Sequence, residues 1–165
     1  MGVEDADGYF TGDDVEEVLA EIGAVLDDNT DGNLVKRVLR VTFDPSTNAS
    51  ERTVAAHSST VTLPDNAIVT RAWYEVLTTF TSAADTATIS IGIDTDDAGG
   101  IVVAVAINDG SNPWDAGYHE GIQDGAAANF STKTTAADRT IDFTVAVQAL
   151  TAGKLVLFLE YVVSD

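Results

Sequence analysis

Residues 68–94 decide the fold, and they read IVTRAWYEVLTTF (68–80), TSAAD (81–85) and TATISIGID (86–94). The first run is rich in β-branched and aromatic residues, which fit a pleated, half-buried surface. The second run alternates isoleucine with threonine, serine and glycine, so it predicts a strand with one dry face and one wet face. Because the link between the runs is short, an antiparallel hairpin is expected. Two strands alone cannot bury this much apolar surface, so the rest of the chain must supply a second layer.

Strand-like patterns with short turns recur from Leu34 to the end of the chain. About eight strands of this kind predict a mainly-β domain over residues 34–165, a β-sandwich or jelly roll of antiparallel strands. The continuous apolar run Ile101–Ile107 predicts a strand that is buried on both faces. Leu155–Val163 is apolar on both sides, which indicates a central position in a sheet or a contact between subunits.

The first expected strand, Leu34–Asp44, holds three of the eight basic residues of the chain, namely Lys36, Arg37 and Arg40. Alternation places Lys36 and Arg40 on one side, with Arg37 on the other. These cations could meet acidic neighbours in the same subunit or across an interface.

Residues 1–33 form an expected N-terminal arm with an amphipathic helix and an acidic linker. Asp13 can cap the helix, with Glu16 at the third helical position. An apolar stripe at helical spacing follows, and it consists of Val15, Val18, Leu19 and Ile22. A helix of about three to four turns is marginal alone. The stripe is therefore expected to dock on the β domain, on a sister subunit or on a larger scaffold.

Two acidic turns contain oxygen ligands suited to a hard cation such as Ca²⁺ or Mg²⁺. In the first turn, Asp27, Asn29 and Asp31 occupy positions 1, 3 and 5 of a calcium-loop pattern, but Val38 stands at position 12 in place of a bidentate Glu. The second turn contains Asp94, Asp96 and Asp97. Turn geometry on an acidic surface explains both clusters without a metal, and we favour that interpretation.

A long polar, glycine-rich segment runs from Asn108 to Thr135 and contains Trp114, Tyr118, His119 and Phe130. Long connections without periodicity are usually functional or are ordered by a neighbour. Aromatic residues in such a loop favour contact surfaces. An alternative of equal weight is that these aromatic side chains plug one end of the sandwich.

The sequence contains no recognisable catalytic constellation. It has no GxSxG turn, HExxH pair, phosphate-binding loop or GxGxxG, and its two histidines, His57 and His119, are isolated. It also lacks cysteine, which excludes disulfides and thiolate chemistry. We therefore expect neither an enzyme nor a resident cofactor.

Charge is the strongest compositional signal, with 27 acidic residues against 8 basic ones and a net charge of −19. Such a surface repels itself at low ionic strength and is screened at molar salt. The Asp-rich, Lys-poor composition favours a protein that works in brine over an ordinary acidic protein. It also argues against direct binding to nucleic acid or to anionic lipid.

Two parts of the sequence resemble virion proteins of tailed viruses. Residues 8–26, GYFTGDDVEEVLAEIGAVL, look like a helix that precedes a β domain in phage head-decoration, head-fibre and tail-fibre proteins. The residues that carry this match are Gly8, Phe10, Thr11, Gly12, Val15, Glu16, Leu19 and Glu21. Residues 134–165, together with ISIGIDTDDAGGIV and WDAGYHEGIQDG, are similar to small β-sandwich virion proteins. The acidic composition departs from common phage members and fits a virus of halophilic archaea.

The resemblance implies an assembly protein located in the virion. We expect a capsid decoration protein that forms a homotrimer or another symmetric homo-oligomer on the major capsid protein or other virion proteins. The alternative is a receptor- or glycan-binding turret or fibre module, since jelly rolls also serve as lectin domains. A hydrolase ranks third, because nothing points to two carboxylates converging across a cleft.

Overall fold

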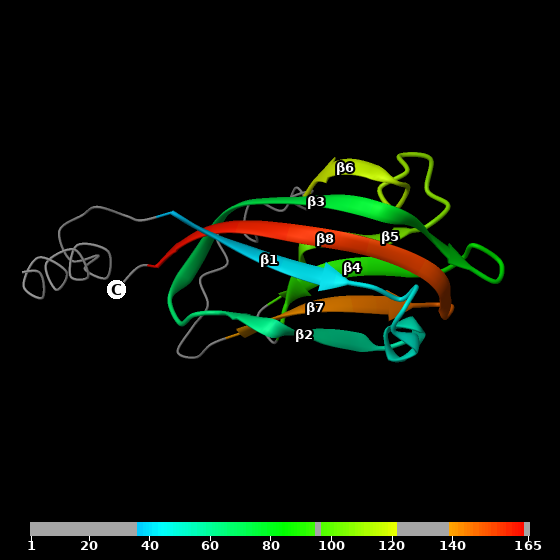
Figure 1. Cartoon of the computed structure of the whole chain (residues 1–165), viewed down its shortest axis with the longest axis horizontal. Coiled ribbons are helices and arrows are strands. Elements are labelled where there is room, and N and C mark those ends of the chain that lie inside the picture. The colour runs from blue at the N-terminus through cyan, green and yellow to red at the C-terminus, as the bar shows by residue number, and fades with distance from the viewer. Residues whose placement is uncertain (1–35, 95–96, 122–138, 164–165) are drawn as a thin grey trace, which may run out of the picture. The chain divides into compact units, whose positions relative to one another are not determined.

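A computed structural model describes residues 36–94, 97–121 and 139–163, and these residues form two layers of β-sheet (Figure 1). The elements are β1 (Arg37–Phe43), the 3₁₀ turn η1 (Ala49–Arg52), β2 (Ala56–Leu63), β3 (Ala67–Ser82), β4 (Thr88–Ile93), β5 (Asp97–Ala106), β6 (Gly117–Glu120), β7 (Arg139–Ala146) and β8 (Leu150–Val163).

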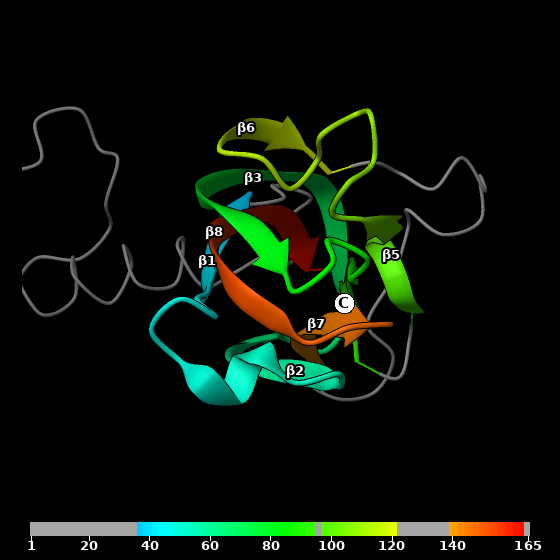
Figure 2. The ribbon, with the colours of Figure 1, turned by 90° about the vertical axis from the view of Figure 1, so that its right-hand side faces the viewer.

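The strands form two antiparallel four-stranded sheets, which Figure 2 shows nearly end-on. Sheet A has the order β1-β8-β3-β6, and sheet B has the order β2-β7-β4-β5. The pairs β1 with β8, β2 with β7, β3 with β6 and β4 with β5 are all present. This nested pairing of the first strand with the last is the topology of a jelly roll, so the expected mainly-β sandwich is confirmed.

The prediction that residues 68–94 form an antiparallel hairpin is wrong. β3 lies in sheet A and β4 lies in sheet B, so the chain crosses between the layers after Ser82. Two hydrogen bonds within the turn hold it together. The Asp85 N–H donates to the Ser82 carbonyl, and the Ser82 N–H donates to the Asp85 carboxylate. Local alternation predicted both strands, but it contains no information about which sheet each strand joins.

A bulge in β3 shifts the face on which its side chains lie. The register against β8 slips between Val69 and Arg71, so Thr70 and Arg71 are both exposed. Val69 therefore belongs to the core, although simple alternation places it on the face of Trp73. One extra residue in a strand has this effect because side chains alternate with a period of two.

The core lies between the two sheets and consists of their inward-facing side chains. Leu155, Leu157 and Leu159 of β8 in sheet A and Ile89, Ile91 and Ile93 of β4 in sheet B belong to this one core. β8 lies between β1 and β3, so its expected central position is confirmed. β5 is an edge strand with Ala104 exposed, so the expectation that Ile101–Ile107 is buried on both faces is wrong.

Candidate interaction surface

Most residues singled out from the acidic and helical patterns lie outside the described residues. They are Val15, Val18, Leu19, Ile22, Asp27, Asn29, Asp31, Asp96 and Phe130. The Asp94 N–H donates to the Thr140 carbonyl at 3.0 Å, and Asp97 begins β5, with a side chain outside the description. Within the described ranges, no three acidic or histidine residues gather closely enough to hold a metal ion. Cation binding at either turn stays a prediction.

Trp114 is fully buried, so its expected place on an exposed contact loop is wrong. Its indole N–H donates to the Val105 carbonyl at 3.1 Å, and its ring packs near Tyr74 and Phe80. Burial of a large ring with its polar N–H satisfied is the stable arrangement for tryptophan. Burial also raises the pKa of Tyr74 to about 12, and the Tyr74 hydroxyl donates to the Pro113 carbonyl at 2.9 Å. Trp114 is thus anchored in the core, which is the position that the plug alternative gives this residue.

Tyr118 and His119 lie on opposite faces of β6 because they are consecutive in a strand. The His119 ring stacks on Tyr74 at 5.1 Å, and its Nε2 is 2.8 Å from the Asp115 carbonyl oxygen. Tyr118 points outward and is 58% exposed. His119 and Glu120 therefore cannot form an acid–base pair, and the same geometry separates His57 from Ser58 on β2.

The outer face of sheet A brings together bulky and basic side chains from four strands. The register sets Arg40 of β1 opposite Phe158 of β8, Phe158 opposite Trp73 of β3, and Trp73 opposite Glu120 of β6. Neighbouring rows add further side chains to this face. We call it the basic-aromatic face, and it comprises Lys36, Val38, Arg40, Arg71, Trp73, Tyr118, Val156 and Phe158, together with the carboxylates Glu75, Glu120 and Glu160.

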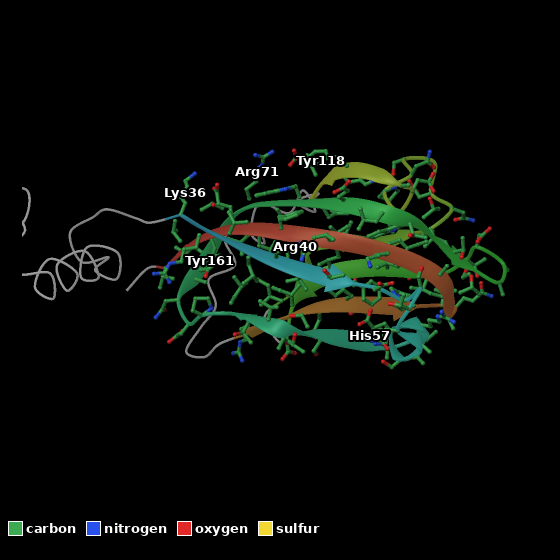
Figure 3. The ribbon with its side chains drawn as sticks, viewed as in Figure 1. Lys36, Arg40, His57, Arg71, Tyr118 and Tyr161 are labelled. Carbon is green, nitrogen blue, oxygen red and sulfur yellow. The ribbon has the colours of Figure 1, made fainter. Side chains whose placement is uncertain are left out.

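Figure 3 labels Lys36, Arg40, Arg71 and Tyr118 on the sheet A side of the sandwich, whereas His57 lies on β2. Alternate residues of β8 lie on opposite faces of sheet A, because Leu155, Leu157 and Leu159 belong to the core cluster and the residues between them do not. Val156 is only 4% exposed, yet it lies outside that cluster. Val156 is therefore buried on the outer side of sheet A, apart from the core between the sheets.

An aromatic pair forms the centre of the basic-aromatic face. The rings of Trp73 and Phe158 are 5.6 Å apart between centroids and 10° from parallel. The Arg71 guanidinium lies 5.1 Å from the Trp73 ring centroid, within the range of a cation–π contact. Both rings are half-buried, so each retains exposed surface for a partner.

Ion pairs surround this aromatic pair. Arg71 contacts the Glu120 carboxylate at 2.9 Å, and Lys36 contacts Glu160 at 3.0 Å. Hydrogen bonds from Tyr118 and Arg71 lower the pKa of Glu120. Hydrogen bonds from Thr70 and Lys36 lower the pKa of Glu160. Both carboxylates thus stay ionised and neutralise nearby cations.

Arg40 differs from these paired cations. It is exposed, and within the described residues it makes no hydrogen bond or ion pair. Its guanidinium lies in the row of Phe158 and Trp73, so an unpaired cation flanks apolar surface. Sequence reasoning identified Arg40 as a candidate for an interface but could not place it beside the two rings.

A polar pocket of about 420 Å³ opens between the edges of β1 and β2 and beside η1. Stacked rings of Phe43 and Phe143, 4.7 Å apart, lie at its apolar side. Three of its polar groups bond one another, because the Asn48 side-chain amide donates to the Glu51 carboxylate at 2.8 Å and the Ser50 hydroxyl donates to the Asn48 side-chain oxygen at 2.7 Å.

No helix in the described ranges is both long and apolar enough to span a bilayer. No protein-family model matches the sequence, and no match was found among curated proteins. Solved structures are more informative. A chain of the "Cyanophage Pam1 capsid asymmetric unit" superposes with a TM-score of 0.57, over 79% of this chain and 86% of that one, at 17% identity.

Two further structures match at similar strength. A chain of the "Capsid of Ralstonia phage GP4" has a TM-score of 0.54 and 18% identity, covering 84% of this chain and 89% of that one. A chain of the "Acidic stable capsid structure of Helicobacter pylori bacteriophage KHP30" has a TM-score of 0.53 and 15% identity, with coverages of 79% and 90%. At these identities the likeness shows a shared fold across nearly the whole of the matched chains.

Proposed function

We propose that this chain is a structural protein of a tailed-virus virion that decorates the capsid surface as a symmetric homo-oligomer, most simply a trimer. The observation that carries the proposal is the jelly-roll topology shared with chains of three phage capsid structures. The N-terminal resemblance to head-decoration and head-fibre proteins supports the finer assignment. The role is assembly without catalysis, in the virion, with the major capsid protein or other virion proteins as partners.

In this proposal the N-terminal apolar stripe of Val15, Val18, Leu19 and Ile22 anchors the protein to another subunit or to the capsid. A marginal amphipathic helix needs a partner for its apolar face. Neither nucleic acid nor membrane is expected as a direct partner, because the net charge of −19 repels both.

Purified virions test the assignment. Quantitative mass spectrometry of intact particles should find this chain in a fixed, multiple copy number relative to the major capsid protein. Antibody labelling should place it over the head, and mild stripping should release it while leaving heads intact. Absence of the chain from intact virions would refute the proposal, and labelling of the tail alone would refute the decoration role.

The alternative function is a receptor- or glycan-binding turret or fibre module. The hydroxyl-rich pocket beside His57, with the stacked Phe43 and Phe143 rings, is the observation that favours it. A glycan array and adhesion to host cells would distinguish the two functions. Specific glycan binding that is lost in His57→Ala would favour the alternative, since a decoration protein contacts capsid copies and needs no sugar.

We also propose that the protein works at high salt, which the acidic, lysine-poor composition supports. Melting temperature and assembly are expected to rise from ~0.1 M to ~3 M NaCl or KCl, as the Debye length falls from ~10 Å to below ~3 Å. If Asp94, Asp96 and Asp97 hold a cation, millimolar Ca²⁺ should replace part of that requirement, and Asn substitutions there should abolish only the calcium effect. An unchanged melting temperature and oligomeric state across this range would contradict the proposal.

A further inference from the structure

The pocket beside η1 lies where β2 carries polar side chains on the side that faces the core. The less exposed positions of β2 alternate with exposed ones, and they include His57 and Ser59 before the fully buried Leu63. The His57 ring, labelled in Figure 3, stacks on Phe43 with 5.9 Å between the ring centroids. Protein interiors are close-packed and leave few voids. Here polar side chains at the edge of the core border a hollow of about 420 Å³, which is within the usual size range of small-molecule sites.

An irregularity in β2 shapes one wall of this pocket. The pairing of β2 with β7 advances four residues along β2, from Ser58 to Thr62, but only two along β7. The Ser59 hydroxyl bridges the gap, because it accepts from the Ile141 N–H at 3.2 Å and donates to a carbonyl of its own strand at 2.6 Å. Bulges of this kind interrupt regular pairing and re-aim side chains next to functional sites. Residues 58–60, which form this bulge, all line the pocket.

Hydrogen bonds within the loop fix the opposite wall, which η1 provides. The Glu51 carboxylate accepts from the Asp44 N–H and from the Asn48 side-chain amide. The Arg52 guanidinium donates to two backbone carbonyls of the same loop. A wall whose side chains are already held in place loses little conformational freedom when a ligand binds.

Several polar groups of the lining are free to bond a ligand. Among the described residues, the hydroxyls of Thr42, Ser58 and Thr60 have no hydrogen-bond partner. The His57 Nε2 lies 2.8 Å from the Thr53 carbonyl oxygen, which can only accept, so Nε2 carries the proton. The Nδ1 of the neutral ring is then an acceptor. Hydroxyls both donate and accept, so this set matches a ligand that is itself rich in hydroxyl groups.

The charges and rings of the lining exclude other ligand classes. No lysine or arginine is among the described residues that line the pocket, so an anion would find no counter-charge in a chain of net charge −19. Both oxygens of Glu51, the carboxylate of the lining, already accept hydrogen bonds, which disfavours a cation. A flat aromatic ligand needs an open ring face, but Phe43 and Phe143 are only 1% and 2% exposed. We propose that the pocket binds a neutral saccharide, with Thr60 and His57 as hydrogen-bonding contacts.

Neutral-sugar binding rests on the glycan-binding function and assigns it a sugar class and two contact residues. NMR titration of the purified full-length chain tests it, at the lowest NaCl concentration at which thermal melting shows the chain to be folded. Glucose, galactose, mannose and N-acetylglucosamine are the neutral probes, and glucuronate and N-acetylneuraminate are the charged ones. Thr60→Val removes a hydroxyl from the pocket, and Thr62→Val is its matched control, an exposed threonine of the same strand outside the pocket. His57→Phe keeps a ring against Phe43 and removes both ring nitrogens.

At least one neutral sugar should bind, and more tightly than either charged sugar. Thr60→Val should weaken binding roughly 3- to 10-fold and His57→Phe roughly 10-fold or more, as loss of a hydrogen bond does, while Thr62→Val stays within about twofold of the wild type. Tighter binding of a charged sugar, equal effects of the two threonine variants, or binding of no probe would each overturn the proposal. Virions that contain the chain would keep the decoration role even if the pocket bound no sugar. Sugar binding by a chain that is absent from virions would do the reverse.

Discussion

The outer faces of the two sheets differ sharply, although their inner faces are equally apolar. Sheet A displays Trp73, Phe158 and Arg40, whereas sheet B displays small hydroxyl-bearing and short side chains. The outward residues of sheet B along the paired strands are Ser58, Thr62, Thr88, Ser90, Gly92, Thr140, Asp142, Thr144 and Ala146. Asp142, the carboxylate among them, accepts a hydrogen bond from the Thr140 hydroxyl at 3.0 Å.

This difference separates folding information from functional information. A sandwich needs only one apolar face per sheet, and sheet B follows that rule with an outer face of small and polar residues, of which Ser90 and Asp142 are buried at 7% and 8% exposure. Bulky residues on the outside of sheet A are not needed for the shared interior. An outer face of this kind departs from the alternation of apolar and polar faces that a solvated antiparallel sheet usually shows.

Both faces depend on the interior that they share, so disrupting it should have the largest effect. Gly153 of β8 has a φ of 147°, and a Cβ there would lie 2.1 Å from the Phe80 ring. Gly153→Ala should reduce the free energy of unfolding by about 3 kcal/mol or more, through overlap and backbone strain together. Denaturant unfolding followed by circular dichroism measures it.

The matched control for this change is Gly110→Ala, since no atom lies within 4 Å of a Cβ at Gly110. It should change stability by less than about 0.5 kcal/mol. A similar loss in both variants would mean that glycine flexibility, rather than contact with Phe80, explains the result.

The second prediction compares the two outer faces directly. Trp73→Ala removes a half-buried ring that stacks on Phe158 and lies beneath the Arg71 guanidinium. The free energy of unfolding should fall by about 2 kcal/mol, less than for a fully buried ring. Thr60→Ala, an exposed position on β2, should change it by less than about 0.5 kcal/mol.

Chemical denaturation of the monomeric protein at low concentration separates this loss of stability from any loss of association. Equal effects of Trp73→Ala and Thr60→Ala would show that the aromatic pair contributes nothing within the subunit. The outer faces of sheets A and B would then contribute equally to the stability of the subunit and could differ only in their contacts with partners.

The third prediction concerns the turn that joins sheet B to sheet A. Val147, between β7 and β8, has a φ of 67° and is 71% exposed. The Gln148 N–H donates to the Ala146 carbonyl at 2.8 Å across this residue, which makes a strained three-residue turn. A β-branched residue at positive φ is unfavourable, so Val147→Gly should stabilise the fold by about 1 kcal/mol.

Differential scanning calorimetry would detect this as a rise in melting temperature. Val54→Gly, at a similarly exposed valine for which no positive φ occurs, is the control and should not stabilise. A lower melting temperature for Val147→Gly would show that the valine side chain makes a contact worth more than the strain.

The sequence predicted the strands better than their arrangement. Alternation located β4 and β7 because each has an apolar period of two, and the two-sided apolar run Leu155–Val163 located the second part of β8. It could not assign β3 and β4 to different sheets, because partner choice depends on pairing between distant segments such as β3 with β8. The bulge at Thr70 was equally invisible, since a register shift exists only relative to a neighbouring strand.

The candidate surface was predictable only in part. Arg40 could be placed on one face of its strand, but its row with Phe158 and Trp73 joins residues far apart in the sequence. Trp114 was misplaced for a related reason. It lies in an aperiodic, glycine-rich segment, and only the three-dimensional fold shows the space near Tyr74 and Phe80 that it fills.

The last prediction, with the smallest expected effect, uses acid to test whether the charged groups of sheet A act as a unit. The pKa values of Glu120, Glu160 and Asp44 are all lowered, with hydrogen bonds from Tyr118, Thr70 and Lys154, respectively, as the largest causes. A carboxyl with a lowered pKa in the folded state stabilises the fold above its unfolded pKa of about 4. That stabilisation is lost as the pH falls through the folded pKa. The melting temperature should therefore decrease modestly from about pH 6 to below pH 4, because exposed pairs contribute little.

Glu120→Gln should lower the melting temperature slightly at pH 6 and make its decrease toward low pH less steep, because one of the responsible carboxyls is gone. Glu75→Gln is the control, since Glu75 is exposed on β3 and makes no hydrogen bond or ion pair with the described residues. It makes the same change from carboxylate to amide without removing a hydrogen bond or an ion pair among the described residues. An identical slope in Glu120→Gln and the wild type would mean that Arg71 and Tyr118 do not hold this carboxylate in solution. In that case the pairing of Glu120 with Arg71 and Tyr118 would contribute nothing to the stability of the single chain, and the charged groups of sheet A would not act as a unit.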